Sequence, residues 1–241
     1  MPEQLYRKRF IISLIILIFL IPGVLVWGVV WGDRNYGLTA AVIVILSMLP
    51  FFMVFEHRRP QAREIVPIAV MTALAVVSRV AFLYLPQVKP ILAVVMICGF
   101  AFGAESGFVC GACAMLVSNF FFGQGPWTPW QMLCCGLIGF VSGALSRTPV
   151  GKNRYLMAGA GLVAGYVYGL IVDVWTILGF SQSISWASVL AVYVPAMWFN
   201  TLLAITTALL LFICGMPFIK KLNRLKVKYG LLGANGQNNS N

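Results

Sequence analysis

Residues 90–122, P-I-L-A-V-V-M-I-C-G-F-A-F-G-A-E-S-G-F-V-C-G-A-C-A-M-L-V-S-N-F-F-F, decide the fold class, because Glu105 is their only charged residue. A helix that crosses a bilayer core about 30 Å thick needs roughly 20 apolar residues. This stretch is therefore long enough for two crossings, at 90–104 and 107–122. The short polar break at residues 104–106 predicts a tight antiparallel hairpin, with Glu105 at an interface.

The same apolar character extends along most of the 241-residue chain, which is 61% hydrophobic and 10% charged, with a mean hydropathy of +0.92. These values exceed those of a soluble domain with a charged surface. Pro, Gly and charged residues divide the chain into eight predicted crossings. They are 10–31, 37–55, 65–85, 90–104, 107–122, 129–146, 155–179 and 186–214.

The predicted fold is therefore an all-α, polytopic membrane protein. Residues 1–63 form an amino-terminal pair of transmembrane helices, and residues 64–218 form a six-helix core. Residues 219–241 form a tail that is first basic and then Gly/Asn-rich, which predicts disorder at its end. The basic part is expected to lie along anionic lipid headgroups.

The net charge of +11 comes from short basic clusters between apolar runs, which argues against a nucleic-acid partner. With the amino terminus inside, 14 of the 17 basic residues fall in inner segments, and only Arg34, Arg79 and Lys89 do not. The positive-inside rule then places both termini in the cytoplasm of a bacterial cell, with the chain as a multi-pass protein of the inner (plasma) membrane.

The residue inventory favours no enzymatic or metal chemistry. All six cysteines fall in apolar segments, where they behave as small hydrophobes and predict no disulfides. The spacing of Cys110 and Cys113 lacks a second pair, and the single histidine, His57, lies in a polar loop, so no metal site is predicted. Because ATP-binding and hydrolase motifs are missing, any energy input must come from another chain.

Residues 120–131, F-F-F-G-Q-G-P-W-T-P-W-Q, form the most informative loop and lie on the predicted outer side. Thr128 fits a helix N-cap, followed by Pro129 at the first helical position and by Gln131, which would close a capping box. Trp127 and Trp130 fit either an interfacial aromatic belt or the rim of a pocket that stacks a flat ligand.

Charged and amide side chains within crossings are costly and are functional candidates by default. Asp173 is the best counter-charge for Arg79 or Lys89, although a purely structural ion pair fits equally well. Asn119 and Asn200 can contact either a ligand or another helix. The full set of candidate substrate-binding residues is Arg79, Tyr84, Lys89, Asn119, Gln124, Trp127, Trp130, Gln131, Asp173, Trp175 and Asn200.

Small residues at four-residue spacing, including Ala69 and Ala73 and many glycines, allow close helix packing, mostly within the chain. The helical repeat places Arg79, six residues beyond Ala73, about 120° around the helix from the face of Ala69 and Ala73 as measured at Ala73. One face of that helix is then free to meet a partner while another faces a cavity.

Several of these segments resemble the S component of energy-coupling factor (ECF) transporters over residues 64–218. The resemblance rests on A-V-M-T-A at 69–73, K-P-I-L-A-V-V from Lys89, G-F-A-F-G from Gly99, S-N-F-F-F-G-Q-G-P-W-T-P-W-Q from Ser118 and G-L-I-G from Gly136. The pattern is most similar to the cobalamin-specific, CbrT-like group, and the first two crossings are additional to the six of the family.

The resemblance implies a vitamin importer whose substrate-binding subunit captures its ligand outside, topples in the membrane and docks on a transmembrane coupling subunit driven by two ATPases. Ala69 and Ala73 would form the docking face, and the chain would have no intrinsic cofactor and catalyse nothing. The implied ligand is a corrinoid such as cobalamin. Because no crossing contains histidine, recognition would rest on shape and amide contacts and would admit cobinamide.

Three alternatives remain open. The importer could take a queuosine precursor or another flat vitamin instead of a corrinoid. The chain could be a non-transport membrane scaffold. It could also be an intramembrane enzyme that uses Asp173 or Glu105 as acid or base, although the sequence offers no second convergent catalytic group.

Overall fold

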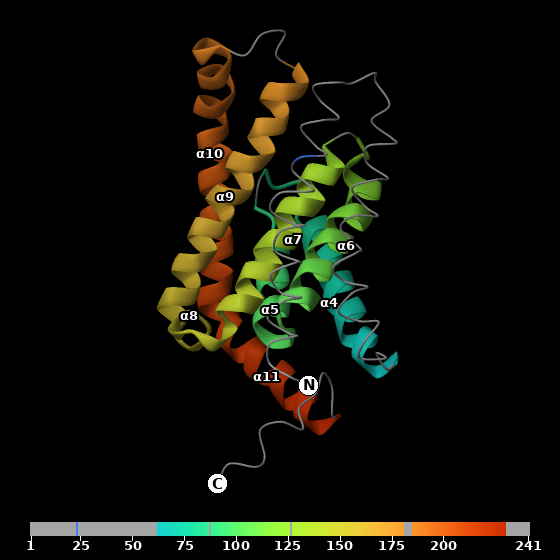
Figure 1. The fold of residues 1–241 in the computed structure, drawn as a ribbon. Coiled ribbons are helices and arrows are strands. Elements are labelled where there is room, and N and C mark those ends of the chain that lie inside the picture. Colours follow the sequence, from blue (N-terminus) through green and yellow to red (C-terminus); the bar gives the residue numbers. More distant parts are fainter. Residues whose placement is uncertain (1–22, 24–61, 87, 126, 181–184, 230–241) are drawn as a thin grey trace.

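The computed structural model describes residues 62–86, 88–125, 127–180 and 185–229, together with Gly23. Every regular element within these ranges is a helix (Figure 1), which confirms the predicted all-α class. The two crossings predicted at 10–31 and 37–55 lie outside the described residues, as do residues 230–241 of the predicted tail.

Six helices follow the six predicted core crossings closely. They are α4 (Ala62–Ala81), α5 (Ile91–Phe102), α6 (Ala104–Phe122), α7 (Thr128–Ala144), α9 (Arg154–Phe180) and α10 (Trp186–Leu210). Two further helices are α8 (Pro149–Lys152), which follows a 3₁₀ turn at Leu145–Arg147, and α11 (Met216–Lys228), which a π-helical turn at Leu211–Gly215 joins to α10.

Three helical segments among the described residues are long and apolar enough to span a membrane. They are Ala104–Phe122, Arg154–Ile177 and Trp186–Lys228. Large apolar side chains on α4, α9 and α10 are exposed, including Val70, Val163 and Val194. Lipid can cover such faces at no hydrophobic cost, so these helices suit the periphery of a membrane bundle.

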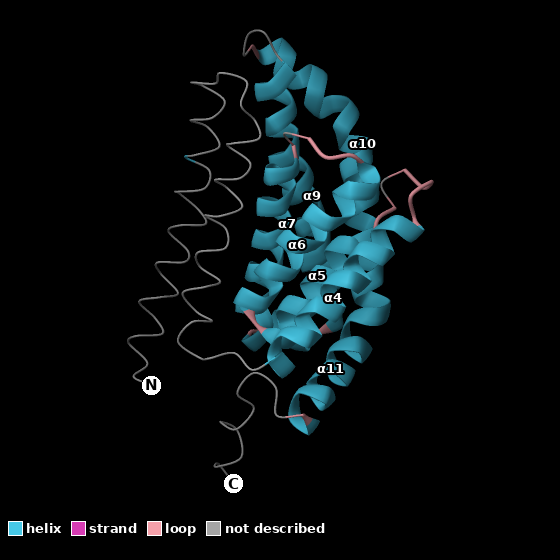
Figure 2. Cartoon of the chain, turned by 90° about the vertical axis from the view of Figure 1, so that its right-hand side faces the viewer, coloured by secondary structure: helices cyan, strands magenta, loops and turns pink. Residues whose placement is uncertain are grey.

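Helix α5 is the central element of the bundle. Its residues are apolar on all sides and almost all of them are buried, as expected for a helix surrounded by others. It contacts α4, α6, α7 and α9, and α11 packs against it at the lower end of the bundle in Figure 2. Its 12 residues span roughly 18 Å, well short of a bilayer core of about 30 Å. Its first turn begins inside the bundle, because Ile91 and Leu92 are buried.

The predicted hairpin between the fourth and fifth crossings is confirmed, but a single residue makes the turn. Gly103 alone separates α5 from α6, and its φ of 99° is a backbone conformation that side chains with a Cβ rarely adopt. The turn therefore lies one residue before the predicted break at 104–106. Glu105 follows it in the first turn of α6 and is half-buried.

Glycines bring neighbouring backbones into direct contact. A Cβ on Gly107 of α6 would collide with the backbone of Gly139 on α7, and a Cβ on Gly165 of α9 would collide with Ala204 on α10. These small residues therefore serve packing within the chain, as the sequence predicts for most of them.

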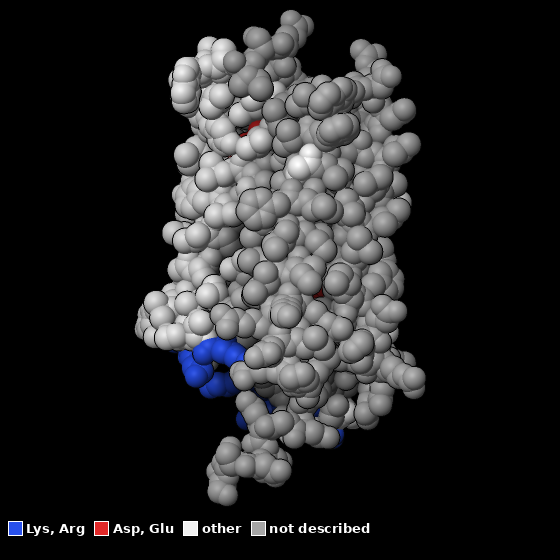
Figure 3. Space-filling view, in the orientation of Figure 1, with Lys and Arg blue, Asp and Glu red and all other residues white. Residues whose placement is uncertain are grey.

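The two ends of the bundle differ in charge. Basic side chains gather at the end where α8 and α11 lie (Figure 3). Lys152 belongs to α8, Arg154 begins α9, and α11 carries several lysines. The loop at residues 123–127 precedes α7, whereas α8 follows it, so this loop lies at the opposite end. On α4, Ala69 and Ala73 are exposed whereas Arg79 is buried, in agreement with the predicted separation of their faces.

Candidate functional site

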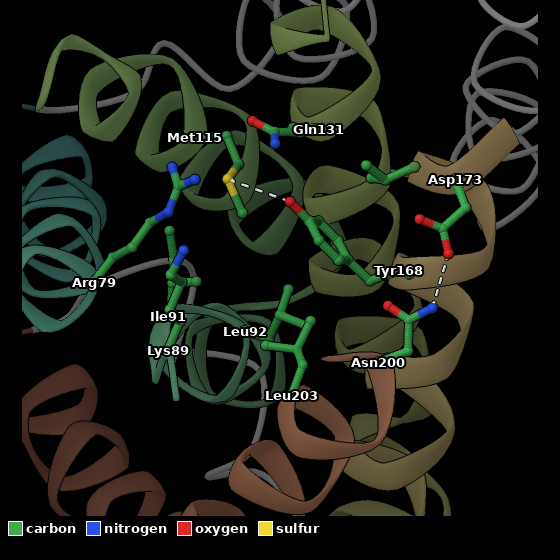
Figure 4. Close-up of a pocket in the computed structure, with 12 residues that line it drawn as sticks. Arg79, Lys89, Ile91, Leu92, Met115, Gln131, Tyr168, Asp173, Asn200 and Leu203 are labelled. Atoms are coloured by element: carbon green, nitrogen blue, oxygen red, sulfur yellow. Dashed lines mark hydrogen bonds between the residues drawn. The ribbon is translucent and has the colours of Figure 1, made fainter. Parts of the chain in front are cut away.

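A cavity of about 130 Å³ lies among α4, α5, α6, α7, α9 and α10 (Figure 4). Polar side chains enter it from several helices, and apolar side chains make up the rest of its wall. The polar residues are Arg79, Lys89, Gln131, Asp173 and Asn200, and the others are Ile91, Leu92, Met115, Tyr168, Gly169, Val172 and Leu203. This mixture suits an organic ligand with an apolar body and polar edges.

Arg79 enters the cavity from the last turn of α4 and is only 6% exposed. Its Nη1 donates hydrogen bonds to Ser118 Oγ (2.5 Å) and Asn119 Oδ1 (2.7 Å) on α6. Its guanidinium carbon also lies 4.3 Å from the centroid of the Phe122 ring. Three contacts from one neighbouring helix therefore fix the direction of this buried cation.

Asn119 links Arg79 to the start of α7. Its Nδ2 donates to Thr128 Oγ1 (3.0 Å) and to Gln131 Oε1 (2.8 Å). Asn119 is 1% exposed, so this amide uses both its acceptor and its donors within the protein. The amide therefore positions Arg79 and one wall residue of the cavity, Gln131, together.

The predicted capping box at the start of α7 is wrong. Trp127, rather than Thr128, is the N-cap residue, and no side chain caps the helix there. The Thr128 hydroxyl instead donates to Gln124 Oε1 (3.0 Å), and Gln124 Nε2 donates to the Leu116 carbonyl (2.8 Å). The physical reason is that hydrogen bonds with Asn119 occupy the two side chains that would form the box. The same bonds connect the loop at residues 123–127 to Arg79.

Asp173 and Asn200 form the polar part of the wall contributed by α9 and α10. Asn200 Nδ2 donates to Asp173 Oδ2 at 2.8 Å. Gly169 makes room for this pair, because a Cβ there would overlap the side-chain amide of Asn200. The amide partner stabilises a carboxylate that the helices partly shield from solvent.

The ion pair considered between Asp173 and Arg79 or Lys89 is not formed. Within the part of the chain that the structure describes, Asp173 bonds Asn200, whereas Arg79 bonds Ser118 and Asn119. Both charged groups line the same cavity. Their charges are therefore available to a ligand placed between them.

Five of the predicted binding residues line the cavity, and the others do not. Trp130 and Trp175 are buried against each other, with ring centroids 6.3 Å apart and planes tilted by 39°. Trp127 packs against the hydrophobic core, and Tyr84 is 93% exposed. Asn119 and Gln124 act behind the wall through the bonds described above. Direct ligand contact by these six residues stays a prediction.

Several wall residues have no strong signal in the sequence. Tyr168 places its hydroxyl 3.9 Å from Met115 Sδ across the cavity (Figure 4). Leu92 and Leu203 are ordinary leucines in apolar helices, so only their three-dimensional position identifies them. Ser118, which lies behind the wall and bonds Arg79, had a weak signal in the sequence, because it directly precedes Asn119 in an otherwise apolar helix.

The cysteines in the described helices are all free, and Cys98, Cys110, Cys134 and Cys135 are buried. Among the residues that the structure describes, no three His, Cys, Asp or Glu side chains come together as metal ligands. The polar groups of the cavity are thus amides, a phenol and single charges, a set suited to binding an organic molecule.

Comparison with known proteins identifies the family. The sequence model described as ECF-type riboflavin transporter, S component, matches residues 60–224. No curated protein and no solved structure matches the chain. The match spans more than half of the chain and includes every cavity residue. The chain therefore belongs to the S-component family of ECF transporters, the substrate-binding membrane subunits of vitamin importers, which are transport subunits rather than enzymes.

Proposed function

We propose that this chain captures a vitamin in the cavity between α4, α5, α9 and α10 and hands it to an ECF transmembrane coupling subunit powered by two ATPases. The observation that carries the proposal is the cavity itself. Charges of both signs and two amides face a small, partly open cavity among apolar helices, in a member of a substrate-binding family. Polar groups of this kind are energetically costly within a membrane, so they are candidates for a functional role by default.

Riboflavin is the vitamin that the cavity supports best. Tyr168, Met115 and Leu92 offer an aromatic and apolar surface for a flat ring. Arg79 and Gln131 present hydrogen-bond donors that suit the hydroxyl groups of the ribityl chain. Asp173 presents a carboxylate that suits the imide N–H of the isoalloxazine ring. The name of the matching family points to the same vitamin.

A corrinoid, cobalamin or cobinamide, is the second candidate. Residues 118–131 resemble the cobalamin-specific group, and Ser118, Asn119 and Gln131 of this segment form the network around Arg79. A corrin ring is several times larger than the cavity of about 130 Å³, and riboflavin also exceeds this volume. Both ligands would therefore require the cavity walls to move apart, a corrinoid much further than riboflavin. A queuosine precursor is the smallest of the three candidates.

The proposed transport cycle uses the two faces of α4. The cavity end faces outward, because the basic residues of α8, α9 and α11 suit the cytoplasmic side. Ala69 and Ala73 lie on the exposed face of α4 and form the docking surface for the coupling subunit. A ligand can drive docking only if it binds the docked and free states with different affinities.

Uptake measurements in a host without its own vitamin importers test the proposal. Radiolabelled riboflavin, cobalamin and a queuosine precursor are supplied to cells with this chain alone, with the three ECF partner subunits, or with partners whose ATPases are inactivated. We expect uptake of one vitamin only with active partners. Uptake by the chain alone would contradict the proposal. Stable assembly without uptake or binding of any of the three vitamins would favour a scaffold instead.

A further inference from the structure

The first turn of α5 faces the cavity without a cap. Pro90 is the N-cap residue and its side chain makes no hydrogen bond, while Ile91 and Leu92 line the cavity. The first N–H groups of a helix have no partner within the helix, and the helix dipole adds a partial positive charge there. This end of the cavity therefore favours an anion, provided that a second feature selects one.

Arg79 is that second feature. Its Nη1 uses its two hydrogens on Ser118 and Asn119, whereas no residue that the structure describes accepts a hydrogen bond from Nε or Nη2. In the described part of the chain Asp173, which lines the same cavity, bonds Asn200 and does not bond Arg79. A guanidinium that is 6% exposed thus has unused donors and no carboxylate in direct contact. Such burial is costly unless a partner supplies the missing charge.

Lys89 adds a second cation beside Arg79. Its Nζ lies 4.8 Å from the centroid of the Phe122 ring, the same ring that Arg79 contacts at 4.3 Å. Burial and the charge of Arg79 lower the pKa of Lys89 below its ordinary value. Two like charges held on one aromatic ring repel each other, and an anion between them would relieve the repulsion.

We infer that Arg79, Lys89 and the uncapped start of α5 form an anion subsite that binds a carboxylate or phosphate group on a ligand of this cavity, such as the phosphate of a phosphorylated vitamin. The inference rests on the proposed function, because it concerns the same cavity. Asp173 on α9 repels an anion from the other side, so the ligand binds in one orientation. Flavin mononucleotide should then bind better than riboflavin, and cobalamin, which contains a phosphodiester, better than cobinamide.

Equilibrium titrations of the purified full-length chain in detergent test the subsite. The two matched pairs are flavin mononucleotide against riboflavin and cobalamin against cobinamide. In the pair that binds, the phosphate-containing member should bind about 10- to 100-fold more tightly, as expected for hydrogen bonds to charged groups. Lys89→Gln should reduce this preference several-fold, because it removes one of the two cations and leaves Arg79 in place. Lys152→Gln, which removes an exposed cation at the opposite end, should leave it unchanged.

Lys89 is the better test position, because Arg79→Gln also removes the hydrogen bonds to Ser118 and Asn119 and can unfold the chain. Equal affinity within the pair that binds, or a preference that Lys89→Gln leaves unchanged, would overturn the subsite while leaving the proposed function intact.

If neither flavins nor corrinoids bind, the proposed vitamins fail, and inorganic phosphate alone then tests the subsite. Phosphate should raise the unfolding temperature of the wild-type chain above that in chloride of equal ionic strength. The rise should be clearly smaller for Lys89→Gln, which keeps Arg79 but lacks the second cation. An equal response of the two proteins would overturn the inference.

Discussion

Gly169→Ala tests the geometry of the cavity most sharply. A Cβ at this position would overlap the side-chain amide of Asn200, which is buried and cannot stay in place. The 2.8 Å hydrogen bond from Asn200 to Asp173 would be lost. A hydrogen bond to a charged group contributes about 1.5–3 kcal/mol, whereas alanine gains roughly 0.5–1 kcal/mol over glycine in a helix. The expected net destabilisation is about 1–2 kcal/mol.

Thermal unfolding of the ligand-free protein measures this cost. For a chain of this length, 1–2 kcal/mol corresponds to a fall in Tm of about 2–8 °C. Gly159→Ala is the matched control, because this glycine lies on the same helix and a Cβ there meets nothing within 4 Å. It should leave Tm unchanged or raise it slightly. Equal shifts for the two variants would refute the reasoning.

A double-mutant cycle separates the hydrogen bond from other effects of the substitution. Asn200→Ala alone should lower stability by a similar amount, since it removes the same bond. Adding Asn200→Ala to Gly169→Ala should then cost almost nothing further, because the interaction is already lost. A fully additive double variant would show that Gly169 acts through some other contact.

Three further predictions concern the network, the cation and the docking face. Asn119→Ala should lower the free energy of unfolding by about 1–3 kcal/mol, because it leaves buried partners on α4 and α7 unsatisfied; chemical unfolding measures this, with the exposed Gln124→Ala as a milder comparison. Binding of a phosphate-bearing ligand should weaken as the pH rises through the pKa of Lys89, because Lys89 then loses its positive charge; this pKa lies below its ordinary value of 10.5. In the same titrations, Lys89→Arg should bind this ligand equally well across that pH range, because arginine keeps its charge. Ala69→Trp should abolish co-purification with the coupling subunit and leave ligand affinity unchanged, and intact co-purification would refute the docking face.

The sequence predicted the helices well because membrane helices are encoded by composition over about 20 residues. The start and end of each core helix lie within a few residues of the predicted crossing. The central position of α5 was harder to predict. Its apolar surface shows that it is buried, but the identity of its neighbours depends on how the other helices pack.

The polar residues show why the site was predicted only in part. Arg79, Asp173 and Asn200 were recognisable because polar side chains are rare in apolar helices. Their partners were not, because charge alone favoured an Arg79–Asp173 pair, whereas each side chain bonds an amide on the adjacent helix. Thr128 also fitted a local capping motif, yet Asn119 from α6 provides its hydrogen bond. In both cases contacts between helices override the pattern along the chain.

Native mass spectrometry of the purified chain, without partner subunits, tests most directly whether the cavity alone holds the vitamin. After incubation with riboflavin and cobalamin, the wild-type chain should retain one ligand molecule per protein. Leu203→Trp fills the cavity of about 130 Å³ with an indole ring and should retain none. A ligand that stays bound to the filled variant, or a wild-type chain that retains neither vitamin, would contradict the account.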